Sequence, residues 1–572
     1  MNIMQSWMSL SLVALLLVLG TTPAAATGSG DWTPPENMSG WQDALEVYRL
    51  ETGADGTLAL VWPIFDLTVP QAALYARVRQ PGGSWEPAKN LSGNLASSSI
   101  WNPRYWNAKV APDGTAWVAW TDIDDTQTGD NRRVMVAHRP PGGTWQTEAL
   151  WGYETEIRSA DLAVGPAGDI AVAWVACAAD LTTPSQGPCA LQVRRRFAGA
   201  AAWEPIERLD QSPSSPPDMG IWRAYALVGP GGLTVVVWVE ANPANSNEWA
   251  VRAARWDSKS ATWHVNNDVS NGWFVPLHDE GLAQPVMGED GTVVVAWTGD
   301  YSLVPSPLAG PNALPAHQSA TMNSAGTWSL PAPISTLGGN DLGSPWLSLK
   351  GGVTVAAWER QDTSGKWAIY ANARDAGGTW GSEQQVSPAS ATYTDATIHD
   401  LRQWPGGTAV ILWSAYDNSR PADQDSALFW SGRSPSGTWG GAGQGQLGDW
   451  APNLYGSALA LAEDGSGAAL WATEDSSQPT NQQGTLLAAT WPPGGPAWSQ
   501  PHVIDSGRKL TLIYSGGAVA VPDRSSVAAA WLAGRVGTVI NPAIVSSLAI
   551  FFSELAPGRQ RVYLPLLLRN YR

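Results

Sequence analysis

The sequence is short of cysteine, phenylalanine, histidine and positive charge. Only two of its 572 residues are cysteines, six are phenylalanines and six are histidines, and 33 Lys and Arg face 50 Asp and Glu, for a formal net charge of −17. Nucleic acid is therefore not expected as a partner, because a phosphate backbone is bound by clustered Lys and Arg and the chain has no such cluster. The histidines fall in no metal-ligand spacing, and neither a Gly-x-Ser-x-Gly nucleophile motif nor a phosphate-binding loop is present.

Long hydrophobic runs are missing too, with one exception near the N-terminus. An apolar run spans Met8–Gly20 and is followed by Pro23 and the small residues Ala24–Ala26. This order is typical of a secretory signal peptide, so residues 1–26 are predicted to be one, with a retained membrane anchor as the alternative. The rest of the chain has no segment that could span a bilayer, and we expect it to be secreted, either extracellular or at the cell surface.

The two cysteines, Cys177 and Cys189, lie close together in the sequence. In the oxidising environment of a secreted protein they are expected to form a disulfide, with two free buried thiols as the alternative. Two cysteines alone do not make a zinc site.

Tryptophan, in contrast, is abundant, with 34 residues, and it is regularly spaced. Apolar, β-rich segments that end in tryptophan recur at steps of 54 to 64 residues, at Trp62, Trp120, Trp174, Trp238, Trp297, Trp358, Trp413, Trp471 and Trp531. A constant step indicates a repeat architecture. Several of these segments follow an Asp-Gly pair such as Asp113-Gly114, where positive φ is tolerated, so each is predicted to be the second strand of a hairpin.

A second tryptophan series alternates with the first. It comprises Trp32, Trp85, Trp145, Trp203, Trp263, Trp328, Trp380, Trp439 and Trp498, which usually follow a Gly-rich turn and open another strand. A further short strand, such as Val134–Arg139, lies between the two series, so each unit has four strands. Four strands per unit match a propeller blade better than the much shorter repeat of a parallel β-helix, and the tryptophans are expected to pack between blades.

The phase of the two series predicts how the ring closes. The N-terminal segment 31–40 mirrors the fourth-strand segment 84–93, whereas the last unit has a second strand at Trp531 but no fourth-strand tryptophan. The fold class is therefore all-β: a single large β-propeller of about nine four-stranded blades (eight to ten), closed by the N-terminal strand pairing in the last blade. The propeller is assigned to residues 27–558 and a C-terminal tail to 559–572, with Arg561–Leu568 as a competing last strand.

Function is expected on one face of this propeller, because long loops on a rigid scaffold commonly carry binding sites. Here the connections between second and third strands, and between a fourth strand and the next blade, are long; we call their face the long-loop face. Aromatic residues occur in the connections between blades and acidic residues follow the second strands. The candidate ligand-binding residues are Trp41, Trp101, Trp151, Trp222, Trp273, Trp346, Trp450, Asp122, Asp300, Glu359 and Asp417.

Two interpretations of these candidates stay open. Sugar rings stack on aromatic faces and carboxylates accept their hydroxyl hydrogen bonds, which favours a glycan-binding face. The alternative is structural: acids that solvate loop ends and aromatic rings that pack at the rim. Separately, Asp122, Asp124 and Asp130 supply enough oxygen for calcium, but their spacing is not that of a helical calcium-binding loop. No other cofactor and no metal site is expected.

One turn carries a family resemblance. Asp375-Ala376-Gly377-Gly378-Thr379-Trp380 resembles the core of an Asp-box, and the pairing of an Asp-Gly-led strand with a Gly-Gly-Thr-Trp turn is similar to bacterial BNR or sialidase-like repeat propellers. The resemblance covers nearly all of the mature chain and implies a fold more than an activity, since the Asp-box is a structural turn. The Arg-Ile-Pro motif of the catalytic sialidases is absent, and Arg104, Arg158, Arg223 and Tyr153 show no spacing that selects a catalytic set.

We therefore expect a non-catalytic binding or interaction protein, monomeric, with a glycan or a surface protein as partner and no membrane span in the mature chain. A sialidase-like glycoside hydrolase is the first alternative, and a structural component of the cell surface is the second.

Overall fold

The computed structural model describes residues 36–555, apart from a set of gaps. The gaps are 40–47, 67–70, 94, 97–105, 124–131, 155, 178–188, 211–220, 243–244, 259, 267, 273–274, 277–281, 301–315, 337–339, 363, 376–377, 389–392, 422–423, 452–453, 475–482, 494, 496, 511–517, 524–525 and 535–547. The predicted signal peptide and C-terminal tail lie outside the described residues.

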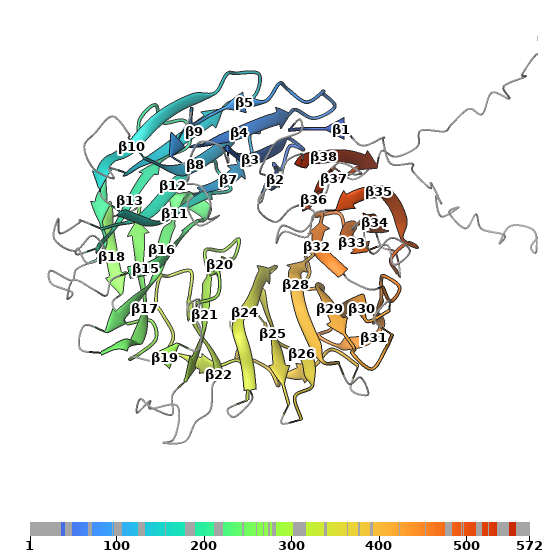
Figure 1. Cartoon of the computed structure of the whole chain (residues 1–572). Helices are drawn as coiled ribbons and strands as arrows, with labels where there is room; N and C mark the ends of the chain where they lie inside the picture. The colour runs from blue at the N-terminus through green and yellow to red at the C-terminus, as the bar shows by residue number, and fades with distance from the viewer. Residues whose placement is uncertain are drawn as a thin grey trace, which may run out of the picture.

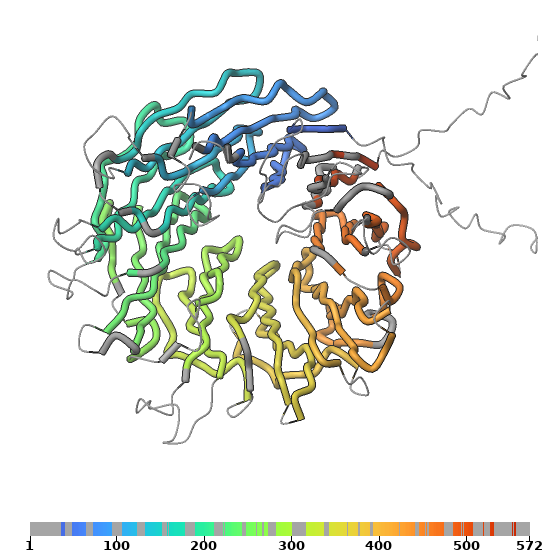
Figure 2. The backbone as a smooth tube through the Cα atoms, viewed as in Figure 1, coloured from blue at the N-terminus to red at the C-terminus, as the bar shows by residue number. Residues whose placement is uncertain are grey.

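The strands form a ring of antiparallel sheets, the blades of a β-propeller, and the chain runs around the ring once (Figures 1 and 2). The first four sheets are β2 (Arg49–Thr52), β3 (Leu58–Asp66), β4 (Gln71–Arg79), β5 (Lys89–Asn90) and β6 (Leu95–Ala96); β7 (Trp106–Val110), β8 (Ala116–Ile123), β9 (Arg132–Arg139) and β10 (Gln146–Glu154); β11 (Glu156–Val164), β12 (Ile170–Cys177), β13 (Cys189–Arg196) and β14 (Glu207–Arg208); and β15 (Ile221–Val228), β16 (Thr234–Asn242), β17 (Asn245–Asp257) and β18 (Thr262–Asn266). The helical segment in the described part is one 3-10 turn, η3 (Pro230–Gly232).

The next three sheets complete the far side of the ring. They are β19 (Val275–Pro276), β20 (Val286–Met287), β21 (Val293–Asp300), β22 (Ala316–Met322) and β23 (Ala332–Pro333); β24 (Asn340–Lys350), β25 (Val353–Gln361), β26 (Trp367–Arg374) and β27 (Gln384–Gln385); and β28 (Asp395–Gln403), β29 (Ala409–Tyr416), β30 (Ser426–Arg433) and β31 (Trp439–Gln446).

The eighth sheet has eight strands and contains two four-strand sets. One set is β32 (Leu454–Leu461), β33 (Gly467–Glu474), β34 (Gln483–Trp491) and β35 (His502–Leu510); the other is β36 (Ala518–Asp523), β37 (Ser526–Gly534), β38 (Leu548–Leu555) and β1 (Glu36–Asn37). Pairing of Lys509 and Leu510 with Gly534 and Ala533 joins the sets. The predicted all-β propeller is thus confirmed, and its blade count lies in the predicted range: eight hydrogen-bonded sheets, one of double width.

The ring closes through the N-terminal strand, as the repeat phase predicted. β1 pairs with β38, with Glu36 opposite Phe552 and Asn37 opposite Phe551 (Figure 1). Met38 is buried against Phe552 in the same cluster as Trp62 of the first sheet. This pairing covers the outer edge of β38, so the first and last sheets are bound together by one short strand.

Asp-Gly turns determine where the inner hairpins reverse. In the β7–β8 turn, Gly114 has φ +82° and the Asp113 carboxylate accepts the backbone N–H of Thr115 at 2.9 Å. The side chain of Asp55 accepts the N–H of Thr57 in the same way, at 2.9 Å. The side chain replaces a backbone acceptor two residues on, which is why the motif recurs where a hairpin must turn tightly.

The first tryptophan series forms the core between neighbouring blades. Eight of its nine members have described side chains, and each is at most 1% exposed: Trp62, Trp120, Trp174, Trp238, Trp297, Trp358, Trp413 and Trp471. Trp174, for example, packs with Ala119 and Val136 of the preceding sheet and with Val172 of its own. The hydrophobic driving force is therefore distributed over all blade junctions.

Cys177 and Cys189 are opposite each other at the ends of β12 and β13 and form a disulfide, with an S–S distance of 2.08 Å. The bond joins the two strands where the chain leaves the sheet toward the long-loop face.

Candidate functional site

The inner strands of the blades border the centre of the ring (Figure 1); they are β2, β7, β11, β15, β20, β24, β28, β32 and β36. A cavity of about 700 Å³ lies there between β15, the segment before β20, β24 and β28. Most of its lining comes from early or middle positions of these inner strands, together with the late position Glu359 of β25, so it lies toward the long-loop face. A second cavity of about 360 Å³ shares Gln284, Leu347 and Arg402 with the first and continues toward the opposite face. The two cavities adjoin each other, and we refer to them together as the channel.

Trp346 places an aromatic ring in this cavity. The pairing of β24 with β25 shifts register between Leu342 and Trp346, and Gly343 in the bulge has φ +70°. Thr298 of the preceding sheet donates its hydroxyl to the Gly343 carbonyl at 2.7 Å, which anchors the bulge. A bulge redirects the side chains that follow it, and Trp346, three residues after Gly343, is 39% exposed.

Glu359 places a carboxyl group in the same cavity. It follows Trp358 at the end of β25, and its Oε1 accepts the backbone N–H of Ile398 on the inner strand of the next blade at 2.8 Å. Burial, helped by the nearby charge of Asp395, raises the pKa of Glu359 to about 7, although the bond from Ile398 opposes the shift. A carboxyl group that titrates near neutrality in a cavity is a candidate for ligand contact.

Charged side chains of the inner strands complete the lining. Arg223 lies over the ring of Tyr225, 4.9 Å from its centroid, on β15. On β28 the carboxylate of Asp400 accepts the Arg402 Nε–H at 2.9 Å and the Leu459 N–H of the next blade at 3.4 Å. Burial raises the pKa of Asp400, while Arg402 and these bonds counteract the increase.

The inner strands are also linked by a carboxylate in the second cavity. Asp161 of β11 accepts the side-chain amide of Asn107 from β7 at 2.6 Å and the backbone N–H of Ala226 from β15 at 2.9 Å. Burial raises the pKa of Asp161, and the two hydrogen bonds oppose the increase. One side chain thus joins three consecutive inner strands, so Asp161 has a structural role at the channel wall.

The structure brings two of the predicted residues together, Trp346 and Glu359. Trp151 and Trp450 are partly buried against hydrophobic clusters. The guanidinium carbon of Arg420 also lies over the ring of Trp450, 3.8 Å from the ring centroid. Trp222 is in β15 and Asp300 ends β21, with side chains outside the described set. Trp41, Trp101 and Trp273 lie outside the described residues, so their role stays a prediction.

The two remaining predicted acids have partners of their own. Asp122 is buried and pairs with Arg133 at 2.6 Å. Asp417 accepts hydrogen bonds from the hydroxyl and the N–H of Ser419, and the hydroxyl bond in particular lowers the pKa of Asp417. In the described part of the chain no three His, Cys, Asp or Glu side chains gather as metal ligands. Asp124 and Asp130 lie outside it, so the calcium hypothesis is untested.

Sequence reasoning missed Arg223 as a cavity residue and did not consider Tyr225, Asp400 or Arg402. All four are on inner strands, which the sequence analysis treated only as hairpin partners. A signal was present: the polar residues Asp400 and Arg402 occupy alternate positions of β28, as expected for a strand with one face in the blade and one on the channel.

Fold and site together define a β-propeller whose central cavity combines an exposed aromatic ring with charged groups. No family model and no curated protein matches the sequence. Similar solved structures include the beta-propeller domain of the Trilobed protease from Pyrococcus furiosus (10% identity, 71% of this chain and 99% of that chain, TM-score 0.36), polysaccharide lyase Uly1 (9%, 82% and 92%, 0.39) and the BP39L lectin from Burkholderia pseudomallei (13%, 70% and 99%, 0.35). At these identities and scores the similarities say nothing about function. Among the described residues there is no helix with the length and hydrophobicity that a membrane crossing requires.

Proposed function

We propose that this protein is a non-catalytic binding protein that takes a glycan in the central cavity, from the long-loop face. The exposed Trp346, which lines the same cavity of about 700 Å³ as the Glu359 carboxyl group, supports the proposal most directly. A sugar ring stacks on an aromatic face, and its hydroxyls need donors and acceptors such as Glu359 and Arg402. The cavity volume is in the range of small-ligand sites.

Replacing Trp346 with Ala is expected to weaken glycan binding at least about tenfold, because the stacking surface is removed. The measurement is a glycan-array screen of the wild-type protein, followed by titration of the best ligand against the variant. Tyr416→Ala is a matched control: Tyr416 is also 39% exposed, but at the end of β29 and outside the cavity lining. Equal affinity of Trp346→Ala and wild type would rule the cavity out as the binding site.

A glycoside hydrolase is the second candidate, because Glu359 and Asp400 line the same cavity. A glycosidase needs two carboxyl groups, one of them protonated near neutral pH, and Glu359 meets that condition. Asp400, however, is already engaged by Arg402 and by the backbone N–H groups of Leu401 and Leu459, which favours a structural role for it. Fluorogenic glycosides, a sialoside among them, test this candidate on the array sample: turnover that Glu359→Gln abolishes would replace the binding proposal.

We also propose that the protein acts outside the cytoplasm, at the cell surface or as a secreted protein. The disulfide between Cys177 and Cys189 supports this location, since such bonds persist in oxidising compartments. Mass spectrometry of the N-terminus after expression in a secreting host tests it, with Thr27 as the expected first residue.

A further inference from the structure

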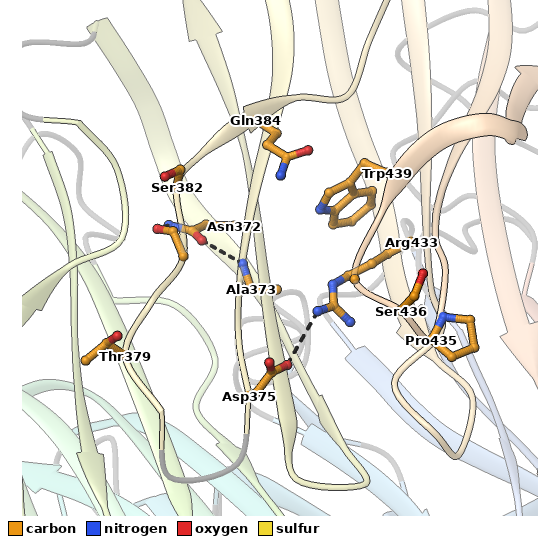
Figure 3. Close-up of a pocket in the computed structure, with 12 residues that line it drawn as sticks. Asn372, Ala373, Asp375, Thr379, Ser382, Gln384, Arg433, Pro435, Ser436 and Trp439 are labelled. Atoms are coloured by element: carbon orange, nitrogen blue, oxygen red, sulfur yellow. Dashed lines mark hydrogen bonds and ion pairs between the residues drawn. The ribbon is translucent and has the colours of Figure 1, made fainter.

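Another pocket, of about 300 Å³ and outside the channel, lies between two neighbouring blades near the face opposite the long loops (Figure 3). One wall is the end of β26 and the turn toward β27, with Asp375, Thr379, Gly381, Ser382 and Gln384; the other is the turn from β30 to β31, with Arg433, Pro435, Ser436 and Trp439. The first wall contains the Asp-box-like turn. None of these residues belongs to the central cavity.

Arg433 is the charged group of this pocket, and its hydrogen bonding is incomplete. Its side chain is 7% exposed, and Nη1 donates to the Gly407 carbonyl at 3.1 Å. Nη2 reaches the Asp375 carboxylate only at 3.5 Å, and that carboxylate is 79% exposed (Figure 3). Nε has no partner among the described residues. A buried guanidinium donor without an acceptor is costly, because its desolvation is not compensated.

The same position in another blade shows what is missing. Arg139 ends β9 six residues before Trp145, as Arg433 ends β30 six residues before Trp439. Arg139 donates through Nε, at 2.7 Å, and through Nη2 to the two carboxylate oxygens of Glu86 in the preceding blade. Such a two-point contact is the geometry that guanidinium and carboxylate prefer.

Glu86 directly follows Trp85, and the residue that directly follows Trp380, in the blade before Arg433, is Gly381. The glycine is not required by the backbone: a Cβ built there would lie 3.4 Å from its nearest neighbours, an ordinary contact. The blade before Arg433 therefore has no carboxylate at the position from which Glu86 pairs with Arg139. The pocket includes the position from which that side chain would project.

The other groups that line the pocket indicate which kind of ligand could supply a carboxylate to Arg433. The indole of Trp439 borders the pocket beside Arg433 and offers an apolar face (Figure 3). Thr379, Ser382 and Gln384 are exposed polar side chains on the facing wall. An aromatic face, several hydroxyl and amide groups and one guanidinium edge suit a sugar ring that bears a carboxylate better than an aliphatic acid.

We propose that the pocket between β26–β27 and β30–β31 is a second binding site, for a carboxylated monosaccharide unit. The ligand carboxylate takes the Nε and Nη2 donors of Arg433, and the ring lies against Trp439. Asp375 stays in solvent. The site is separate from the central cavity and does not depend on its function.

Titration of the full chain with methyl β-glucuronide, and with methyl β-glucoside as the neutral counterpart, tests the proposal by ligand-observed NMR or calorimetry. The glucuronide is expected to bind at least about tenfold more tightly, because only it offers a carboxylate to Arg433. Gly381→Glu, which supplies the carboxylate from within the chain, is expected to abolish the difference and to raise Tm. Arg433→Gln is expected to abolish it as well.

Two controls keep the test decisive even if a variant folds poorly. Glu86→Gly removes the internal carboxylate from Arg139 and is expected to create a second glucuronide site, seen as increased stoichiometry. Trp346→Ala in the central cavity is expected to leave glucuronide affinity at this pocket unchanged. Unchanged glucuronide affinity in well-folded Gly381→Glu overturns the proposal, as does binding of acetate or an N-acetylglutamate amide as tight as that of the glucuronide, which would mean that no sugar is read.

Discussion

Replacing Trp174 with Ala is expected to reduce the free energy of unfolding by about 3–5 kcal/mol, the usual cost of deleting a buried aromatic side chain. Trp174 is fully buried between the second and third sheets, where it packs with side chains of both. The cavity left behind cannot close easily, because each blade is held in place by its neighbours on both sides. Urea unfolding followed by circular dichroism measures the loss.

A Trp174→Phe variant distinguishes the contribution of aromatic packing from that of the indole N–H group. The indole Nε1 has no hydrogen-bond partner in the described part of the chain, so the phenylalanine variant loses packing volume but no hydrogen bond. Its loss should be clearly smaller than that of Trp174→Ala. Trp145→Ala is the matched control from the second series, since Trp145 is only partly buried against the same kind of junction. A loss as large for Trp145 as for Trp174 would contradict the distinct role assigned to the first series.

The architecture could be predicted because it depends on local chemistry that repeats. An Asp-Gly pair specifies a hairpin turn, and a buried tryptophan ends the strand that follows it, so two series of residues were enough to predict the approximate number of blades. Closure could be predicted from a single comparison, since the segment around Asn37 has the same pattern as that around Asn90, and β1 and β5 occupy matching positions at the ends of their sheets. The pairing of β35 with β37, which joins the two four-strand sets of the eighth sheet, was not predicted. It involves only two residue pairs, too few to leave a pattern in the sequence.

The site was harder to predict, because the loop aromatics look alike in sequence and differ in their surroundings. Trp450 packs beside Phe429 and under Arg420, whereas Trp346 follows a bulge and is exposed in the channel. The bulge could not be predicted from the residues around Trp346 alone, because the side chain that anchors it, Thr298, belongs to another blade. The same holds for Arg433: its sequence context matches that of Arg139, and only the spatial comparison shows that Gly381 stands where a glutamate pairs in the other blade.

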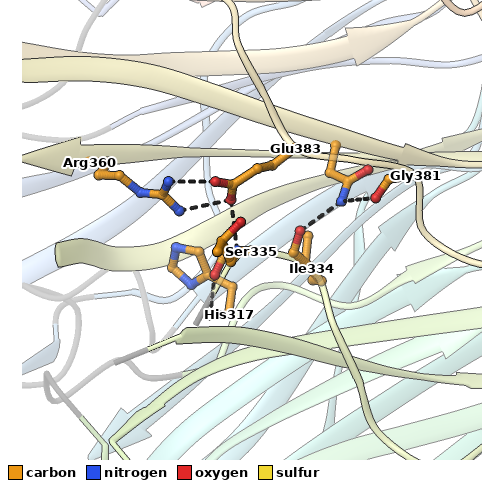
Figure 4. A network of polar contacts seen from close by, with 8 residues as sticks. His317, Ile334, Ser335, Arg360, Gly381 and Glu383 are labelled. Carbon is orange, nitrogen blue, oxygen red and sulfur yellow. Dashed lines mark hydrogen bonds and ion pairs between the residues drawn. The ribbon is translucent and has the colours of Figure 1, made fainter. Parts of the chain in front are cut away.

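The two carboxyl groups best suited to a pH experiment have opposite environments. Burial raises the pKa of Glu359 to about 7. Burial also acts on Glu383, but two hydrogen bonds from Arg360, at 2.7 and 2.9 Å, and one from the Thr336 N–H outweigh it and lower the pKa of Glu383 (Figure 4). The folded protein therefore resists ionisation of the first group and favours ionisation of the second.

Glu359→Gln is expected to stabilise the protein at pH 8 by up to about 3 kcal/mol and to change little below pH 4.5, provided that the new side-chain amide still accepts the Ile398 N–H. The pKa of Glu359 is higher in the folded than in the unfolded wild type, so between pH 4.5 and 7 the folded state binds more protons and stability decreases as pH rises. The glutamine variant has no titrating group at this position, so its stability does not decrease for this reason. Urea unfolding of both proteins at pH 4.5, 6 and 8 measures the difference. Glu383→Gln is the control of opposite sign: it should destabilise by a nearly constant amount from pH 5 to 8, and less as pH falls below 4. A stability gap for Glu359→Gln that did not grow with pH would show that Glu359 is ionised in the folded protein, and it would remove the protonated carboxyl group on which a hydrolytic role for this cavity depends.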